Sequence, residues 1–417
     1  MEELKECRIC RGTTLKEVLA LGNIFPSAFI DNLTSISLQE KVPLTLVECQ
    51  HCGLVQLKYT VELDQMYRQY WYSSSLNASM VSSLKDIVDE IERRVPIQRE
   101  DTIVDIGCND GTLLGLYTRE VANKVGFEPA LNIRPKDNNV TTWIPEYFSK
   151  EQWDTYHKHP NHPEWANAKA KVVTAIAMFY DLPDPNKFVR DVVSILHEDG
   201  VFVIQFTDFL SMIKINAFDN ICHEHLEYYK LFDVIKLFKA HRLDVIDVSY
   251  NDVNGGSVRV TASHEGRYRI RESVFNSFLR EGEYLDRNSF EKLSECVKET
   301  IFNLHSFLSS MKSLGKTVTV LGASTKGNTL LQVCGVTRDL VPYAAEINKD
   351  KWGLKTIGSN IFIIPETEAL ALKPDYLLVL PWHFRDNLLA RKHIKKYMEE
   401  GGKLVFPLPK FEIVGKE

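Results

Sequence analysis

The segment FDNICHEHLEYY, residues 218–229, concentrates groups that can exchange protons. His223, Glu224 and His225 are consecutive, and Glu227 and a tyrosine pair follow them directly. A histidine beside a carboxylate suits general acid–base catalysis, because imidazole titrates near neutral pH. The competing interpretation is a polar turn, or buried histidines whose hydrogen bonds are satisfied by neighbouring carboxylates. A metal site is a poor interpretation, since the zinc-protease motif needs the spacing H-E-x-x-H on a helix.

Alternating apolar strands and a helix precede this segment. The runs KVVTAIAM from Lys171 and GVFVIQF from Gly200 are separated by the helical stretch NKFVRDVVSIL. This alternation predicts a parallel sheet of an α/β fold, with ligands at the carboxyl ends of its strands. Residues 218–229 follow such an end and are therefore expected to face a ligand. Ala177 and Met178 end another strand, where lining a cofactor pocket and packing the rim of the sheet are equally good interpretations.

A glycine-containing loop follows an earlier strand in DTIVDIGCNDGTLLGLY, and a helix is expected to begin near Thr112. The next strand, in KVGFEP, ends in Glu128, a position from which a carboxylate can hold both hydroxyls of an adenosine ribose. Neither the dinucleotide fingerprint G-x-G-x-x-G nor the phosphate loop G-x-x-x-x-G-K-[ST] occurs. The pattern resembles the S-adenosylmethionine pocket of class I methyltransferases, whose signature D/E-x-G-x-x-x-G matches Asp105, Gly107 and Gly111. The residues that we expect to hold this cofactor are Asp105, Gly107, Asn109, Asp110, Gly111, Glu128, Ala177 and Met178.

Four of the eight cysteines form two C-x-x-C pairs near the amino terminus, Cys7 with Cys10 and Cys49 with Cys52. Two such pairs could close a tetrahedral thiolate site around zinc. The zinc is expected to be structural, because four thiolates leave no position open for substrate or water. Buried or redox-active cysteines are the alternative. A zinc ribbon that binds nucleic acid remains a separate class of function.

Composition limits the remaining possibilities. The 417 residues exceed what one hydrophobic core usually serves and predict two or three domains. Hydrophobic residues make up 44% and charged residues 25%, as in ordinary globular proteins. The net charge of -6 argues against a nucleic-acid partner, since phosphate binding needs excess Lys and Arg. With neither a signal peptide nor a membrane-length apolar run, the sequence predicts a cytoplasmic protein.

A second strand–loop–helix pattern, KTVTVLGASTKGNTLLQVCG, begins after a charged helical stretch at 271–314. Its helix would start next to Lys326, where backbone amides and an ammonium could grip a diphosphate; a structural turn with an exposed lysine is an equal alternative. Two further strands, VPYAAEI and PDYLLVLP, support a second parallel α/β unit. Candidates for substrate binding come from this region, from the segment 218–229 and from the motif NGGSVRV. They are His223, Asn254, Arg259, Ser324, Lys326, Asn348, Lys351 and His383.

The whole chain resembles the three-domain bacterial sugar C-methyltransferases. The motifs occur in that family's order and spacing: CRIC…CQHCGLVQL, YWYSSS, VDIGCNDG, GFEP, FDNICHEH, NGGSVRV, LGASTKGNTLL and PWHF. This resemblance implies a zinc-binding domain over residues 1–75 and a central S-adenosylmethionine domain over 76–265. It implies a further Rossmann-like α/β domain over 266–417 that helps to hold a nucleotide-linked keto-sugar.

The resemblance also assigns the catalytic chemistry. A base removes the proton on the carbon beside a ketone, and hydrogen-bond donors stabilise the enolate. The family's Glu-His pair falls on Glu224 and His225, with His225 favoured as the base. The family's amino-terminal tyrosine falls in QYWYSS, at Tyr72 by preference and Tyr70 as second choice. An aromatic plug between domains is the alternative function of that segment.

Two positions depart from the family pattern. Cys222 stands where characterised relatives have a tyrosine, and a thiol is a weaker hydrogen-bond donor than a phenol. The segment MFYDLPDP places Tyr180 and Asp181 near the expected site, so Tyr180 is a candidate to replace the missing phenol.

The sequence therefore predicts a C-methyltransferase that acts at the carbon beside the ketone, expected to be C3, of a nucleotide-linked 4-keto-6-deoxysugar. Its expected cofactors are S-adenosylmethionine and structural zinc, and its expected partner is the sugar substrate, without nucleic acid or membrane. We expect a monomer or weak dimer. The alternatives are an O- or N-methyltransferase and the zinc-ribbon nucleic-acid-binding protein.

Overall fold

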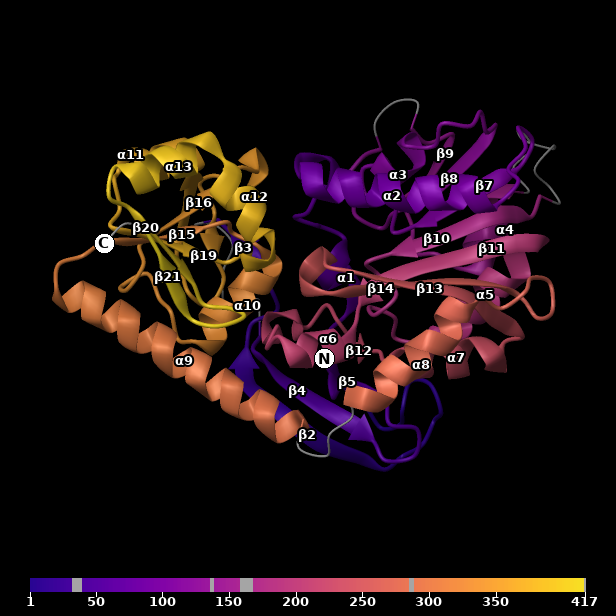
Figure 1. The fold of residues 1–417 in the computed structure, drawn as a ribbon, viewed down its shortest axis with the longest axis horizontal. Helices are drawn as coiled ribbons and strands as arrows, with labels where there is room; N and C mark the ends of the chain where they lie inside the picture. Colours follow the sequence, from indigo (N-terminus) through magenta and orange to yellow (C-terminus); the bar gives the residue numbers. More distant parts are fainter. Residues whose placement is uncertain (32–39, 136–138, 158–167, 285–288, 416–417) are drawn as a thin grey trace.

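The computed structural model describes residues 1–31, 40–135, 139–157, 168–284 and 289–415. A small β unit lies between two α/β domains and below them in the view of Figure 1. The histidine- and proline-rich stretch that begins at Tyr156 predicts a surface loop, and its residues 158–167 lie outside the described residues. Among the described helices, none has both the length and the apolar character that a membrane span requires.

The amino-terminal unit is built on an antiparallel meander in which β2 pairs with β4 and β4 with β5. Its elements are β1 (Glu2–Glu3), β2 (Leu15–Ile24), β3 (Phe29–Ile30), β4 (Val42–Cys49), β5 (Val55–Leu57), β6 (Tyr59–Thr60), α1 (Leu63–Tyr67) and the 3₁₀ helix η2 (Ser74–Leu76).

The amino-terminal unit exchanges strands with both neighbouring domains: its sheet takes up a strand from the central domain, and it adds a strand to the sheet of the carboxy-terminal domain. Strand β12 (Glu227–Tyr228), which ends the segment 218–229, pairs antiparallel with β5. Strand β3 pairs with β17 (Lys355–Thr356) at the edge of the carboxy-terminal sheet. The amino-terminal unit is therefore joined by backbone hydrogen bonds to both α/β domains, and its sheet includes β12 from the end of the segment 218–229.

The central domain holds a seven-stranded sheet in the order β13-β14-β11-β10-β7-β8-β9. Strands β9, β8, β7, β10 and β11 are parallel, and β14 runs antiparallel between β11 and β13. The parallel part reproduces the doubly wound 3-2-1-4-5 order, in which ligands bind beyond the carboxyl ends of the strands. Its elements are α2 (Ala78–Arg94), β7 (Thr102–Ile106), α3 (Thr112–Gly115), β8 (Asn123–Phe127), β9 (Thr142–Ile144), α4 (Lys150–His157), β10 (Ala170–Ile176), α5 (Pro185–Ile195), β11 (Leu196–Thr207), α6 (Phe209–Lys214), η4 (Phe218–Asn220), β12 (Glu227–Tyr228), α7 (Leu231–Ala240), β13 (Leu243–Asn251), η5 (Val253–Gly255) and β14 (Ser257–His264).

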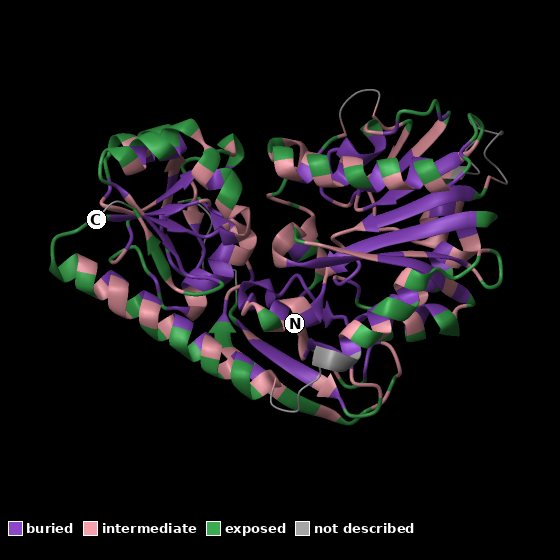
Figure 2. Ribbon diagram, in the orientation of Figure 1, coloured by how far each residue is buried: buried purple, intermediate pink, exposed green. Residues whose placement is uncertain are grey.

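Alternate residues of the central strands pack on opposite layers of helices. Val201 and Val203 of β11 belong to the apolar cluster that holds α2. Phe202 and Ile204 belong to the cluster that holds α5 and α7. This period of two buries both faces of the sheet, and Figure 2 shows the strands buried while the outer faces of the helices are exposed.

The carboxy-terminal domain contains the second parallel sheet that the sequence predicts. Strands β16, β15, β19 and β20 are parallel neighbours, with β18 beyond β16, and β21 and β17 at the antiparallel edges. Its elements are α9 (Ser289–Ser313), β15 (Val318–Leu321), α10 (Thr325–Val333), β16 (Tyr343–Glu346), η6 (Lys349–Lys351), β17 (Lys355–Thr356), β18 (Phe362–Pro365), α11 (Glu366–Ala371), β19 (Tyr376–Val379), η7 (Trp382–Phe384), α12 (Arg385–Ala390), α13 (Lys392–Glu399), β20 (Lys403–Phe406) and β21 (Glu412–Val414). Helix α8 (Glu272–Tyr284), which precedes them, packs against β13 and α7 of the central domain.

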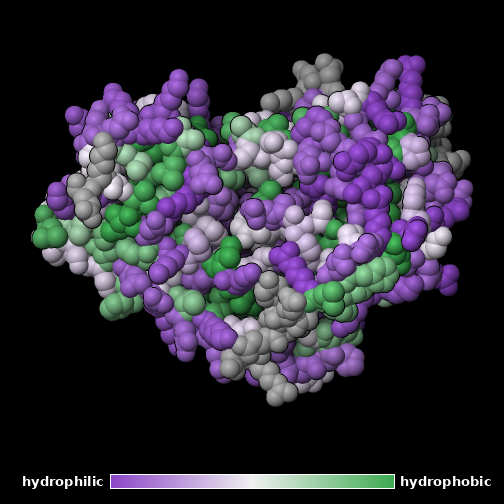
Figure 3. All heavy atoms as spheres, viewed as in Figure 1, coloured by the Kyte–Doolittle hydropathy of each residue, from purple (hydrophilic) through white to green (hydrophobic). Residues whose placement is uncertain are grey.

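Helices α8 and α9 lead from the central domain to the carboxy-terminal one, along the lower side of the molecule in Figure 1. Phe275 and Leu279 of α8 are exposed, and Figure 3 shows hydrophobic atoms gathered over this helix.

Candidate functional site

The four amino-terminal cysteines converge on one point. Their Sγ atoms all lie within 4.8 Å of one another, with Cys7 3.6 Å from Cys52 and Cys10 3.5 Å from Cys49. Tetrahedral coordination with Zn–S bonds of about 2.3 Å places sulfur atoms about 3.8 Å apart. The donor set therefore fits one zinc ion and leaves no coordination position for substrate.

The expected cofactor turn lies at the carboxyl end of β7. Gly107 and Gly111 have φ angles of 72° and 73°, in the left-handed region that favours glycine. A Cβ at Gly107 would come within 3.1 Å of the side chain of Met178, beyond β10. Met178 thus lies beside the turn, and Ala177 adopts a φ of 55°, a strained conformation for a residue with a side chain.

The acidic residues of the turn have separate environments. Glu128 accepts hydrogen bonds from the backbone amides of Asn109 and Ala130, and burial raises its pKa. Each of its carboxylate oxygens keeps a lone pair that a ribose hydroxyl can use. Burial raises the pKa of Asp105 to about 7, and its carboxyl accepts from Thr174 inside the sheet, so Asp105 supports the turn from behind.

Asp110 connects the turn with the amino-terminal unit. It accepts hydrogen bonds from Ser73 Oγ, from the amide of Ser75 and from Thr112. These bonds outweigh the effect of burial and lower its pKa. An ionised Asp110 therefore holds the QYWYSS segment against the cofactor turn, together with Asn109, which donates to the carbonyl of Tyr72.

His225 has the geometry of a proton acceptor. Its Nδ1 lies 2.8 Å from the backbone oxygen of Asn220. Because a carbonyl oxygen can only accept, Nδ1 carries the ring proton and Nε2 keeps its lone pair. Burial, with a smaller contribution from the positive charge of Lys326, lowers the pKa of His225 to about 3. The imidazole is therefore neutral at physiological pH.

Tyr180 brings the end of β10 to this histidine. The two rings are 4.2 Å apart between centroids and tilted by 56°. The backbone oxygen of Tyr180 accepts from the amides of Leu226 and Glu227, so residues 224–227 are fixed to the end of β10. Met178 lies beside the cofactor turn at Gly107, and Tyr180, two residues further along the same loop, lies beside His225. This loop therefore connects the cofactor turn with the histidine.

Two carboxyl groups belong to this part of the site: Glu224, which directly precedes His225, and Asp181, which interacts electrostatically with Glu224. Burial raises the pKa of Glu224, and its Oε2 is a buried atom without a hydrogen-bond partner. Burial and the negative charges of Glu224 and Glu227 raise the pKa of Asp181 well above its ordinary value. Burial thus raises the pKa of both carboxyl groups, and the charge of Glu224 adds to the shift at Asp181.

The tyrosines of the amino-terminal unit take different positions. The hydroxyl of Tyr67 donates to the backbone oxygen of Glu224 over 2.9 Å. Burial and the charges of Asp181 and Glu224 raise the pKa values of both Tyr67 and Tyr70 well above 10, so these phenols stay protonated beside the carboxyl pair. Tyr72 is 38% exposed and lies towards Asp110. The structure thus brings Tyr70 to the carboxyl pair and leaves Tyr72 nearer the cofactor turn.

Lys326 reaches the same cluster from the carboxy-terminal domain. Its Nζ donates to Asn220 Oδ1 over 2.5 Å, and Asn220 is the residue whose backbone oxygen holds His225. Ser324 caps α10 by accepting from the amide of Gly327, which starts the helix beside Lys326. Burial, with a smaller contribution from the positive charge of Lys326, lowers the pKa of His383 to about 3, so His383 lies near this cluster as well.

Other candidates have structural partners. His223 turns away from His225 and bonds the backbone oxygen of Val42 through Nε2. Lys351 donates to the carbonyl of Ala323 and pairs with Glu346 at 3.6 Å. His223 therefore joins its segment to the amino-terminal unit, whereas Lys351 is used inside the carboxy-terminal domain.

Arg259 is held inside the central domain. It contacts Asp86 and Glu90 of α2 and the side chain of Gln205, and it is 5% exposed. Its charge is therefore used within the domain and is turned away from the junction of the domains.

The last two candidates lie at contacts between domains. Asn348 donates to the backbone oxygen of Trp71. Asn254, with a φ of 55°, precedes Gly255, where a Cβ would come within 2.9 Å of Trp382. These residues join the domains around the cluster of His225.

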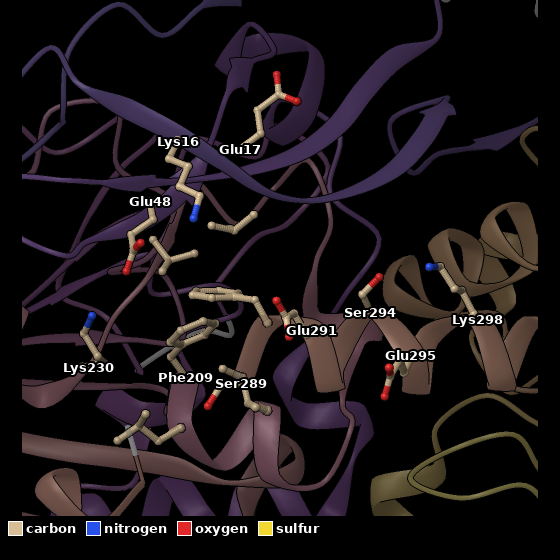
Figure 4. Close-up of a pocket in the computed structure, with 15 residues that line it drawn as sticks. Lys16, Glu17, Glu48, Phe209, Lys230, Ser289, Glu291, Ser294, Glu295 and Lys298 are labelled. Carbon is tan, nitrogen blue, oxygen red and sulfur yellow. The ribbon is translucent and has the colours of Figure 1, made fainter. Parts of the chain in front are cut away.

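A cavity of about 760 Å³ lies elsewhere, between the amino-terminal sheet, α6 and the start of α9. The charged residues that line it, shown in Figure 4, include both lysines and glutamates: Lys16, Glu17, Glu48, Lys230, Glu291, Glu295 and Lys298. None of the candidate catalytic, cofactor or metal residues lines it. It is therefore separate from the site at His225.

Comparisons with known proteins match all three units. The model of a zinc binding domain matches residues 7–67, that of a "Methyltransferase domain" residues 80–248, and that of a "C-methyltransferase C-terminal domain" residues 252–409. C-methyltransferase NovU from Streptomyces niveus is 27% identical over 422 residues, which cover 99% of this chain and 98% of the relative. The chain has the three-domain architecture of a C-methyltransferase. This C-methyltransferase uses S-adenosylmethionine, and its amino-terminal cysteines bind zinc.

Solved methyltransferase structures resemble part of the C-methyltransferase. Magnesium protoporphyrin IX methyltransferase (ChlM) from Synechocystis PCC 6803 with bound SAH is 11% identical, with a TM-score of 0.32, over 45% of this chain and 88% of that one. A SAM-dependent methyltransferase from Anabaena variabilis ATCC 29413 is 12% identical, with a TM-score of 0.35, over 48% and 88%. The strand order, rather than these weak similarities, defines the fold of the central domain.

The sequence did not single out Tyr67 or Asn220, and it placed Asp181 only near the expected site. Tyr67 precedes the QYWYSS motif, Asp181 follows Tyr180, and Asn220 lies ahead of the Glu-His pair. Each gains its role from packing between elements that are distant in sequence. Only the position of Asp181 at the end of a predicted strand pointed to it beforehand.

Proposed function

We propose that this C-methyltransferase methylates the carbon beside the ketone, at C3, of a nucleotide-linked 4-keto-6-deoxysugar. The observation that supports this most is the neutral His225, whose Nε2 keeps its lone pair. Its ring packs on Tyr180, and Lys326 of the carboxy-terminal domain donates to Asn220, the residue that holds its Nδ1. A carbon beside a ketone is weakly acidic, so its methylation needs a base of this kind. A hydroxyl or amine acceptor has less need of one.

Support for the acceptor comes from similarity. NovU, similar over the full length, is a C-methyltransferase, which favours carbon as the acceptor. The ordered motifs from CRIC to PWHF resemble those of sugar C-methyltransferases, which supplies the sugar and its nucleotide.

The residues around the turn after β7 fit S-adenosylmethionine. Gly107 and Gly111 leave the backbone open to the ligand, Glu128 has lone pairs for its ribose, and Ala177 and Met178 border the turn. When bound, this cofactor supplies a methyl group on a positively charged sulfur.

The chain's own residues would then prepare the acceptor. His225 removes the proton from the substrate carbon, and the hydrogen bond from Nδ1 to Asn220 stabilises the imidazolium that forms. Glu224 and Asp181 relay the proton, and the phenols of Tyr67 and Tyr70 stay protonated as hydrogen-bond donors. Packing by Tyr180 fixes the ring of His225, which sets the direction of its lone pair.

The position of the methyl group in the product tests this proposal. The purified protein is incubated with S-adenosylmethionine and thymidine, uridine and guanosine diphosphate 4-keto-6-deoxysugars, and products are analysed by mass spectrometry and carbon NMR. We expect a new C–CH₃ group on one of these sugars. A methyl group on oxygen or nitrogen, or no methylated sugar in the panel, contradicts the proposal.

A further inference from the structure

We propose that the ammonium group of Lys326 stabilises the oxyanion of the enolate that His225 generates, and that it does not grip the diphosphate. This role rests on the proposed function, because it requires a ketone substrate. Lys326 would be a catalytic residue that the carboxy-terminal domain contributes to the chemistry of the central domain.

A single residue holds both the base and the cation. Asn220 accepts from Nδ1 of His225 through its backbone oxygen at 2.8 Å, and from Nζ of Lys326 through Oδ1 at 2.5 Å. Enolisation requires a base at the carbon and a positive group at the ketone oxygen, which is two bonds away. Anchoring both groups on Asn220 keeps them within reach of one such fragment.

Lys326 has donors to spare for this task. An ammonium group has three N–H donors, of which one is used by Asn220. The side chain is half-buried at the start of α10, so the charge acts where water screens it weakly. Its influence on the pKa of His225 agrees with this proximity.

The surroundings of Lys326 are unfavourable for a diphosphate. The acidic groups that face it are Asp219, Asp181 and Glu224, with the thiol of Cys222 beside them. Two phosphate charges would meet repulsion from whichever of these carboxyl groups is ionised, and Asp219 already accepts from the indole N–H of Trp382 over 2.9 Å. A single oxygen that becomes charged during the reaction is better matched to one ammonium group.

The step balances without another reagent. The C–H bond breaks, its proton moves to Nε2 of His225, and its electron pair forms the new C=C bond. The π electrons of the carbonyl move to its oxygen, where Lys326 compensates the charge. Reversal with a proton from solvent returns the ketone, so heavy water labels the substrate carbon even when S-adenosylmethionine is absent.

This labelling separates the two roles of Lys326. Wild-type protein and the variants Lys326→Met, Lys326→Gln and Lys326→Arg are incubated in heavy water with thymidine diphosphate 4-keto-6-deoxyglucose, and deuterium uptake is measured by mass spectrometry. Calorimetry measures the Kd of the sugar, and S-adenosylmethionine binding reports an intact central domain. Lys373→Met, at an exposed position of the same domain, controls for loss of a charge.

We expect Lys326→Met and Lys326→Gln to lower the exchange rate at saturating sugar about 100-fold or more, with Kd changed less than threefold. Lys326→Arg should keep more exchange than either, and Lys373→Met should match wild type. A Kd raised tenfold or more with unchanged exchange at saturation would overturn the role and indicate a diphosphate grip. Absence of exchange in wild type would instead overturn the proposed function, and this role with it.

Discussion

Arg8 and Glu227 form a buried ion pair, with 3.5 Å between Nε and Oε1, that joins the zinc site to the segment of His225. Arg8 lies between Cys7 and Cys10 and also donates to Leu57 O and Thr60 Oγ1. The amide of Leu57 in turn donates to the backbone oxygen next to His225, at residue 226. Contacts from the zinc-binding unit therefore fix the backbone next to His225, the proposed base.

Replacing Arg8 by Met should destabilise the protein by roughly 3–5 kcal/mol, because Glu227 would remain buried without its partner. Chemical unfolding measures this free energy. Arg11→Met is the matched control in the same knuckle, since Arg11 is an exposed residue paired with Glu6 and Asp184, where about 1 kcal/mol or less is expected. Equal losses in the two variants would contradict a special role for Arg8.

Removal of zinc should loosen residues 220–229, because β12 pairs with β5 and β5 follows the second cysteine pair. Hydrogen exchange measured by mass spectrometry, after chelation or in Cys49→Ser, should show faster exchange in this segment. Cys296→Ser, outside the cluster, should leave exchange and zinc content unchanged. Undiminished protection of 220–229 in zinc-free protein would refute this coupling.

Tyr67→Phe should lower kcat about tenfold or more, because its hydroxyl holds the backbone of Glu224 and lies beside Asp181. Tyr72→Phe should have the smaller effect, since that ring is partly exposed and lies nearer Asp110. Steady-state kinetics of both variants checks the order. A larger loss in Tyr72→Phe would restore the preference that the sequence alone suggests.

Substrate exchange by the free enzyme should not lose activity around the ordinary histidine pKa of 6.5. Protonation of Nε2 removes the lone pair, so activity falls as pH falls through the pKa of His225, which burial lowers to about 3. We therefore expect kcat/KM for deuterium uptake to be flat between about pH 5 and 8, with circular dichroism verifying the fold. A decline centred near 6.5 would mean that another group titrates or that His225 is exposed.

The parts of the site that depend on short stretches could be predicted from the sequence. The cysteine pairs and the turn from Asp105 to Gly111 need only local spacing, because each feature forms within one knuckle or one strand–loop junction. Arg259 was a weaker candidate for substrate binding, and the structure pairs its side chain with Asp86 and Glu90 of α2. Local sequence does not reveal which helix covers a strand.

The contacts between domains could not be predicted in this way. The hydrogen bond between Lys326 and Asn220 joins residues 106 positions apart, and that between Tyr67 and Glu224 joins residues 157 apart. Such pairs follow from how the amino-terminal unit is joined to both α/β domains through β12 and β3. From its side chain and its place before a helix, Lys326 was a candidate to bind a diphosphate. In the structure its ammonium group donates to Asn220, the residue that also holds His225.

The measurement that tests the central claim most directly compares wild type with His225→Asn in heavy water, with S-adenosylmethionine and the diphosphate sugars. Mass spectrometry follows methyl gain and deuterium uptake, and calorimetry confirms that both proteins bind the sugar. The account predicts a carbon-bound methyl group and deuterium exchange in wild type, and loss of both in His225→Asn with binding retained. Exchange and methylation that persist in His225→Asn would contradict it, because another group would then be the base.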